Sequence, residues 1–301
     1  MKADINQSEM VRPDARKILI GIGVIILNTF FWAASDTAAQ YLTDSLPALQ
    51  ITFLRYLFHF LLLLPLFRGG FRIALKTEHL ALQILRGVFA AVSGILFIIG
   101  LNIIPVADAT AVTFIAPFVI MAAAALILKE HVGLRRWLAA AIGLVGVIII
   151  VQPGTDAFRW SAFLPAAAAA CGAAAIVITR MMPRENSTVT MLYTGGVGVA
   201  FCGVTTLFAW KTPTLTEIAI AFLVGLFGAL ANFSQIWVYR RLPAPILAPF
   251  SYAQLVWASL LGFLVFGVWP TTATLIGAMI IAASGIYSAY RERVEAVRHS
   301  A

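Results

Sequence analysis

The chain has 301 residues, of which 61% are hydrophobic and only 11% are charged. A soluble domain carries about 25% charged residues because its surface faces water, so this composition excludes a soluble globular protein. The mean hydropathy of +0.94 predicts an all-α integral membrane protein. The net charge of +8 does not indicate a nucleic-acid partner, because the basic residues lie in short loops between apolar runs.

The apolar runs predict about ten transmembrane helices, since one span needs about 20 predominantly apolar residues. The first run continues too long for a signal-peptide core of about 7–15 residues and should remain in the membrane. Proline and glycine fall beside the breaks, as helix-stopping residues should. In chain order the predicted spans are 18–40, 48–67, 80–102, 106–128, 136–151, 160–182, 189–210, 215–239, 246–267 and 271–290.

The loop charges predict the orientation of these spans. Arg55 and Arg86 lie within predicted spans, and the other Lys and Arg residues lie in loops, in tails or at span ends. Of the latter, only Arg159 and Lys211 fall at one side of the predicted membrane, and all the rest fall at the other side. Loops rich in Lys and Arg remain in the cytoplasm. We therefore expect a multi-pass protein of the inner (plasma) membrane with both termini in the cytoplasm.

Two stretches of the chain are alike and predict an internal repeat. The segment 101–105 joins spans three and four and ends in a proline, and the segment 240–245 joins spans eight and nine with two prolines. Halves of five spans each would insert with opposite orientations, a feature of secondary transporters. The predicted organisation is a cytoplasmic tail, two inverted five-helix repeats and a second cytoplasmic tail, at 1–17, 18–151, 160–290 and 291–301.

Short motifs in the first half resemble the EamA domain of the drug/metabolite transporter superfamily. They are Phe31-Trp32-Ala33-Ala34, Leu54-Arg55-Tyr56, Leu128-Lys129-Glu130, and Gly143 with Gly146. The second half matches more loosely and lacks the acidic residue near Val268. The chain looks most like the YddG-type exporters of aromatic and other amino acids. The resemblance implies ten helices, alternating access, and export of small metabolites without ATP.

A few ionisable residues lie inside the predicted spans, where each costs about 2.5–3.5 kcal/mol. They are Asp36, Arg55, His59, Arg86 and Asp108. We expect Arg86 to extend to the cytoplasmic interface. Arg55 should find a carboxylate or several carbonyls, and two interpretations remain open. It forms a fixed ion pair between spans, or it binds a substrate carboxylate or acts in gating; the same choice applies to His59. Asp36 and Asp108 are candidate gating or coupling residues.

Polar and aromatic residues form stripes on several predicted helices. Asn28, Trp32 and Ser35 share one face of the first span. Such side chains often only bind neighbouring helices, but several stripes together predict a central cavity with apolar and aromatic walls. The candidate substrate-binding residues are Asn28, Trp32, Ser35, Arg55, His59, Asn232, Gln235, Tyr239, Tyr252, Gln254 and Trp257. The small-residue runs 122–125 and 166–170 are assigned to helix packing.

No cofactor or metal is expected, because Cys171 and Cys202 lack metal-ligand spacing and no H-E-x-x-H motif or P-loop is present. The predicted function is a secondary transporter that exports aromatic and other neutral amino acids and related metabolites. The alternatives are a multidrug or organic cation exporter of the same fold, a membrane enzyme and a channel. Proton coupling and facilitated diffusion both remain open. The expected partners are a small-molecule substrate and membrane lipid, in a monomer or weak homo-oligomer.

Overall fold

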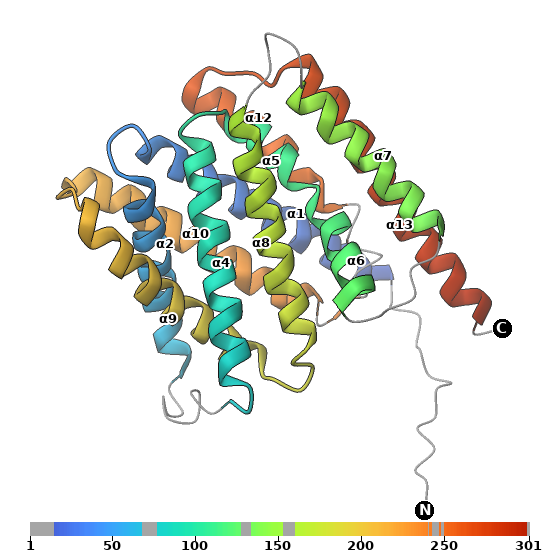
Figure 1. Ribbon diagram of the computed structural model, residues 1–301, viewed down its shortest axis with the longest axis horizontal. Helices are drawn as coiled ribbons and strands as arrows, with labels where there is room; N and C mark the ends of the chain where they lie inside the picture. The colour runs from blue at the N-terminus through green and yellow to red at the C-terminus, as the bar shows by residue number, and fades with distance from the viewer. Residues whose placement is uncertain are drawn as a thin grey trace, which may run out of the picture.

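The structure is a computed structural model that describes residues 15–67, 77–127, 134–152, 160–239, 241–242, 247 and 250–299. All regular elements within these ranges are helical (Figure 1). The predicted motif 128–130 and the prolines at 243 and 245 lie outside the described residues.

The helices of the first half follow the predicted apolar runs closely. This is expected because the backbone polar groups of a segment in lipid must be hydrogen-bonded within the segment, as they are in a helix. In chain order they are α1 (Ala15–Leu42), α2 (Ala48–Leu63) continued by the 3₁₀ turn η1 (Leu64–Phe67), α4 (Leu80–Leu101), α5 (Val106–Thr113), α6 (Ala116–Ile127) and α7 (Leu134–Val151).

The second half also consists mainly of apolar helices. Its elements are η2 (Trp160–Ala162), α8 (Phe163–Arg180), α9 (Ser187–Thr206), η3 (Leu207–Ala209), α10 (Leu215–Tyr239), α12 (Ala253–Phe266) and α13 (Thr272–His299). The last helix extends to His299, beyond the predicted end of the apolar run at residue 290, because a helix that leaves the membrane does not need an apolar sequence to continue.

The predicted fourth span is divided in two at Phe114 and Ile115, where the chain forms a turn between α5 and α6. Pro117 explains the break, because proline has no N–H group to bond the carbonyl four residues earlier. Just before this proline, the amides of Phe114 and Ile115 bond the carbonyls three residues earlier, those of Ala111 and Val112. The change of direction brings Thr113 and Ala116 to the wall of a cavity described below.

Each main packing pair joins a helix of the first half to one of the second. Helix α1 packs on α10, α4 on α8, α2 on α9, and α7 on α13. Figure 1 shows α7 and α13 side by side at one edge of the molecule, with α2 and α9 near the opposite edge. Gly146 and Gly277 permit the close approach of α7 and α13, since a Cβ on Gly146 would lie 2.6 Å from the carbonyl oxygen of Gly277.

Six helical segments within the described residues are long and apolar enough to cross a membrane: Arg16–Leu42, Leu80–Leu101, Val106–Ala123, Trp160–Arg180, Thr188–Thr206 and Leu215–Val238. Four shorter helices are also apolar: Ala48–Leu63, Ala141–Val151, Ala253–Phe266 and Thr272–Tyr287. Many large apolar side chains on these helices are exposed, including Leu126 and Leu264. In a membrane protein such side chains face lipid, so the all-helical, membrane-embedded fold class agrees with the composition.

Candidate substrate cavity

A cavity of about 410 Å³ lies between α1, α2, α4, α8, α9 and α10, with single residues from α5, α6 and α12. Its wall therefore contains residues from both halves of the chain. The volume falls in the range of about 300–1,000 Å³ that is typical of small-molecule sites. Of the residues predicted from the sequence, Trp32, Asp36, Arg55, His59, Asn232 and Gln254 line this cavity.

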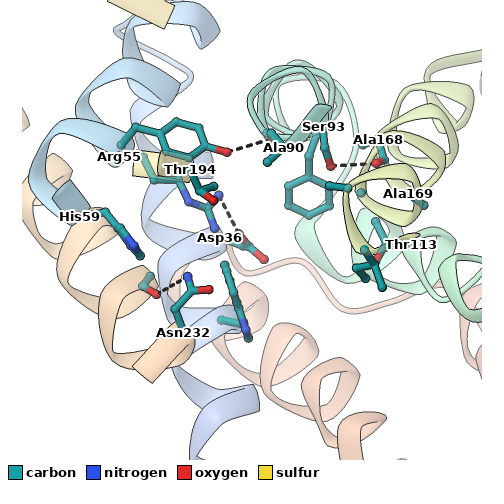
Figure 2. A pocket seen from close by; sticks show the side chains of 18 of the residues that line it. Asp36, Arg55, His59, Ala90, Ser93, Thr113, Ala168, Ala169, Thr194 and Asn232 are labelled. Atoms are coloured by element: carbon teal, nitrogen blue, oxygen red, sulfur yellow. Dashed lines mark hydrogen bonds and ion pairs between the residues drawn. The ribbon is translucent and has the colours of Figure 1, made fainter. Parts of the chain in front are cut away.

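An ion pair forms one side of the cavity. The Nη1 atom of Arg55 lies 3.3 Å from Oδ1 of Asp36, and both side chains are largely buried. The guanidinium of Arg55 also lies over the ring of Trp32, 5.4 Å from the ring centroid, where the negative face of the indole attracts a cation. Figure 2 shows Asp36 and Arg55 facing each other, with His59 and Asn232 on the same side of the cavity. The expectation that Arg55 finds a carboxylate is thus met by Asp36.

Close helix packing positions this ion pair. A Cβ on Gly225 of α10 would lie 3.1 Å from the backbone nitrogen of His59 and 3.3 Å from the carbonyl oxygen of Arg55, so α10 can lie directly against α2. Gly228 is one turn further along and faces the same two side chains, Arg55 and His59, at ordinary contact distances. These glycines leave room for Arg55 and His59 at the point where α2 and α10 meet.

The opposite wall is made of small and aromatic residues. Ser93 donates a hydrogen bond of 2.7 Å to the carbonyl of Ala168, which joins α4 to α8 (Figure 2). Ala169 and Thr113 lie beside this contact in the same view. Phe97 also lines the cavity. The run 166–170, which was assigned to helix packing alone, therefore also forms part of the cavity wall, because its methyl side chains leave space next to α4.

Tyr56 and Arg86 line the cavity, although neither was among the candidate substrate-binding residues. The Tyr56 hydroxyl donates to the carbonyl of Ala90 at 2.8 Å. Arg86 binds hydroxyls of two other helices. Its Nε donates to Oγ1 of Thr179 at 2.7 Å, and its Nη1 donates to Oγ1 of Thr194.

The sequence contains a signal that would have identified this wall. The cavity-lining positions of α4 are 86, 90, 93, 94 and 97, and their spacing places them on one helical face. Alanine and glycine lie between Arg86, Ser93 and Phe97 on this face, so the polar and aromatic stripe is interrupted.

The other predicted site residues lie outside the cavity wall. Asn28 donates to the carbonyl of Ala231 at 2.5 Å and to Oγ of Ser234 at 3.1 Å, and Ser35 donates to the carbonyl of Val224 at 2.9 Å. The stripe of α1 is therefore divided: Trp32 faces the cavity, whereas Asn28 and Ser35 bind α10.

The remaining candidates pack between helices or lie at the surface. Trp257 packs edge-on against Phe30, and Tyr252 packs in the same way against Phe114. Asp108 accepts a hydrogen bond of 2.7 Å from Oγ1 of Thr274. Gln235 is exposed on α10. The side chain of Tyr239 lies outside the described part of the structure.

The described residues contain no cluster of three or more His, Cys, Asp or Glu side chains that would hold a metal ion. Cys202 is buried and Cys171 is partly buried, and both are free thiols. The cavity instead offers aromatic faces, hydroxyls, an amide and fixed charges. Such a lining suits reversible binding of an organic solute with a ring and charged groups.

Comparison with known proteins identifies the class of molecule. The EamA-like transporter family matches residues 19–152 and again residues 159–289. An S-adenosylmethionine uptake transporter from Rickettsia bellii (strain RML369-C) is 29% identical, and the match covers 91% of this chain and 94% of that protein. A riboflavin transporter from Rhizobium johnstonii (strain DSM 114642 / LMG 32736 / 3841) is also 29% identical, over 94% of this chain and 95% of that protein.

A solved crystal structure shares the fold, with a TM-score of 0.62, 19% sequence identity, and coverage of 92% of this chain and 98% of the solved one. The two family matches together account for most of the 301 residues. The chain therefore belongs to the EamA-like transporter family and is a multi-pass membrane transporter.

Proposed function

We propose that this protein transports charged metabolites that contain a fused nitrogen heterocycle, with S-adenosylmethionine as the solute that fits best, by alternating access through the central cavity. The observation that carries the proposal is the wall of that cavity, in which Trp32, Tyr56 and Phe97 occur together with the Asp36–Arg55 ion pair. Aromatic faces stack on planar rings, and fixed charges orient polar groups of a solute.

The substrates named for the two groups of relatives share a fused nitrogen heterocycle with a polar chain attached. S-adenosylmethionine carries a sulfonium, an amino group and a carboxylate, whereas riboflavin is uncharged. The cavity wall contains Asp36, Arg55 and Arg86, and ionisable groups within a membrane are costly unless they serve a purpose. This charge favours S-adenosylmethionine over riboflavin as the solute of the present chain.

The names of the relatives do not support amino acid export, the function expected from the sequence. The relatives described above are named for S-adenosylmethionine uptake and for riboflavin. We therefore replace the expected amino acid by a larger solute that retains an amino-acid group, and the expected export by uptake. The volume of about 410 Å³ supports a solute larger than a single amino acid.

We further propose that the six long and four shorter apolar helices are ten spans, arranged as two inverted halves. If α1, α2, α4, α6 and α7 correspond to α8, α9, α10, α12 and α13, every main contact has a counterpart. The α1–α10 contact exchanges with α8–α4, α1–α12 with α8–α6, and α2–α10 with α9–α4, while α2–α9 and α7–α13 exchange with themselves.

Contacts at two helix ends support the same pairing. Gln50, in the first turn of α2, donates to the carbonyl of Lys211 at 2.6 Å and accepts from its amide at 3.0 Å. Glu185, between α8 and α9, accepts from Oγ1 of Thr77 at 2.7 Å and from the amide of Glu78 at 3.1 Å. Each contact connects the start of the second helix of one half to the loop that follows the second helix of the other half.

The loop charges support an orientation with both termini in the cytoplasm. In this orientation the Thr77–Glu185 contact lies at the cytoplasmic end and the Gln50–Lys211 contact lies at the outer end. Rocking of the two halves about the cavity would break one of these contacts at a time and expose the solute to one side. The absence of an ATP-binding P-loop from the sequence agrees with movement driven by solute or ion gradients.

Uptake into proteoliposomes that contain the purified protein tests the proposal. Labelled S-adenosylmethionine, riboflavin and phenylalanine are supplied separately, with and without an imposed pH gradient. We expect saturable uptake of S-adenosylmethionine above that of protein-free vesicles, and weaker uptake of riboflavin. Uptake of phenylalanine alone would favour the amino acid function expected from the sequence. Uptake of none of the three above empty vesicles would disprove the proposed substrate class.

A further inference from the structure

Arg86 occupies an unusual electrostatic position within the cavity. It lies on α4, and its hydrogen-bond partners among the described residues are hydroxyls on two other helices, Thr179 of α8 and Thr194 of α9. The ion pair that the structure describes at this cavity joins Arg55 to Asp36. Within the part of the chain that the structure describes, the charge of Arg86 is therefore solvated by neutral dipoles and is not neutralised by a carboxylate.

The two threonines hold the guanidinium without supplying a negative charge. Each uses its hydroxyl hydrogen on its own helix: Thr179 donates to the carbonyl of Ala175 at 2.8 Å, and Thr194 donates to the carbonyl of Thr190 at 2.6 Å. Only the lone pairs of these hydroxyls remain for Arg86. The threonines thus act as acceptors that fix the plane of the guanidinium.

Arg86 retains donors for a further partner. A guanidinium has five N–H groups in a rigid fork, and the contacts to Thr179 and Thr194 engage only Nε and Nη1. Nη2 donates to none of the described residues. Since the fork matches the two oxygens of a carboxylate, a bound carboxylate would satisfy the remaining donors and neutralise the buried charge together.

Tyr56 separates the two arginines of the cavity. It follows Arg55 in α2, and its hydroxyl bonds the carbonyl of Ala90, one turn beyond Arg86 in α4. The ring of Tyr56 thus forms the wall between a guanidinium that already has a carboxylate and one that has hydroxyl partners only. The indole of Trp32 and the guanidinium of Arg86 both line this cavity, so one solute can contact both.

We propose that Arg86 binds the carboxylate of the transported solute, with Thr179 and Thr194 as the residues that position it. This inference rests on the proposed transport function and narrows it to solutes that carry one carboxylate. Arg55 does not take this role, because Asp36 already neutralises it. Arg86 then selects for an amino-acid tail, while the aromatic wall accepts the ring system.

The test compares two solutes that differ only in the carboxylate: S-adenosylmethionine and its decarboxylated analogue. For the wild-type protein in proteoliposomes we expect kcat/KM to be about tenfold to a hundredfold higher for S-adenosylmethionine, in line with charge-assisted hydrogen bonds. Arg86→Gln should abolish this preference by lowering kcat/KM for S-adenosylmethionine. Arg86→Lys should retain part of it, because it keeps the charge and loses the fork. Arg184→Gln removes one positive charge outside the central cavity and should retain the full preference.

Each outcome supports or overturns the inference. Equal kcat/KM for the two solutes in the wild type, or an unchanged preference in Arg86→Gln, would overturn the role of Arg86 while leaving the transport function intact. Displacement of labelled S-adenosylmethionine by unlabelled analogue, measured on detergent-purified protein, reports the same preference for a variant that binds but does not transport. If the wild type neither binds nor transports either solute, the proposed function fails, and this inference fails with it.

Discussion

Arg55 and Arg86 line the same cavity from neighbouring helices, yet their surroundings differ in kind. Arg55 has a carboxylate partner in Asp36 and an indole face from Trp32, whereas Arg86 has hydroxyl partners from Thr179 and Thr194. The first arrangement is neutral without any solute. The second gains a counter-ion only from a solute, so the comparison separates an arginine that maintains the structure from one that is available for binding.

Removal of the carboxylate from the Arg55 site should have the largest effect. Asp36→Ala leaves a buried cation without its partner, which costs about 3–5 kcal/mol of stability, and we expect uptake to fall to background. Thermal unfolding of the detergent-purified protein measures the loss. The double variant Asp36→Asn with Arg55→Gln removes both charges and should unfold closer to the wild type. A single variant that unfolds at the wild-type temperature would show that Arg55 does not depend on Asp36.

At the Arg86 site, loss of one hydroxyl acceptor should weaken binding more than folding. Thr194→Val preserves shape and removes a bond that is worth about 1.5–3 kcal/mol when one partner is charged. We expect the KM for S-adenosylmethionine to rise by about tenfold and that for its decarboxylated analogue to change little. Thr205→Val on the same helix is the matched control, because the described partners of the Thr205 hydroxyl are carbonyls of α9. Equal changes for both solutes would contradict a positioning role for Thr194.

The indole of Trp32, which lies over Arg55, should contribute less to stability and uptake than Asp36 or Thr194 does. A cation–π contact contributes about 0.5–2 kcal/mol, and Trp32 also faces the ring of the proposed solute. Trp32→Leu should therefore reduce uptake of S-adenosylmethionine and of its decarboxylated analogue by a similar factor, of less than about tenfold. Trp160 is exposed at the start of η2, so Trp160→Leu provides the control. If Trp32→Leu reduced uptake of S-adenosylmethionine alone, the carboxylate would be recognised near Trp32 and not by Arg86.

The smallest effect concerns the helix end nearest to Arg86. The hydrogen bond from Thr77 lowers the pKa of Glu185 below its usual value. A depressed carboxyl pKa stabilises the folded state above the unfolded-state pKa, and this contribution is lost as the pH falls through the folded-state pKa. Wild-type protein should thus show a slightly steeper loss of thermal stability than Glu185→Gln between about pH 6 and pH 3. Identical profiles would show that the Thr77–Glu185 contact does not contribute to stability.

Much of the fold followed from the sequence because lipid imposes a simple length rule on apolar runs. The break at Pro117 was not predicted, since proline within a span can either kink a helix or end it. The Asp36–Arg55 contact agreed with the expectation that a buried guanidinium finds a carboxylate. The assignments of Asn28 and Ser35 went further than periodicity allows, because a shared face does not distinguish a cavity from a neighbouring helix. The hydroxyl partners of Arg86 were not predicted, because depth alone does not show which way a long side chain points.

The pairing of helices across the two halves has a consequence for how the protein is made. Ser35 and Asn28 bond carbonyls 189 and 203 residues later in the chain, and Gln50 bonds the backbone of Lys211. The helices before Val151 therefore enter the membrane with polar side chains whose native partners have not yet been synthesised. Until α10 is inserted, the side chains of Asn28 and Ser35 must form hydrogen bonds with other groups. The cavity can therefore close only after the ribosome has synthesised the chain as far as α10, which ends at Tyr239.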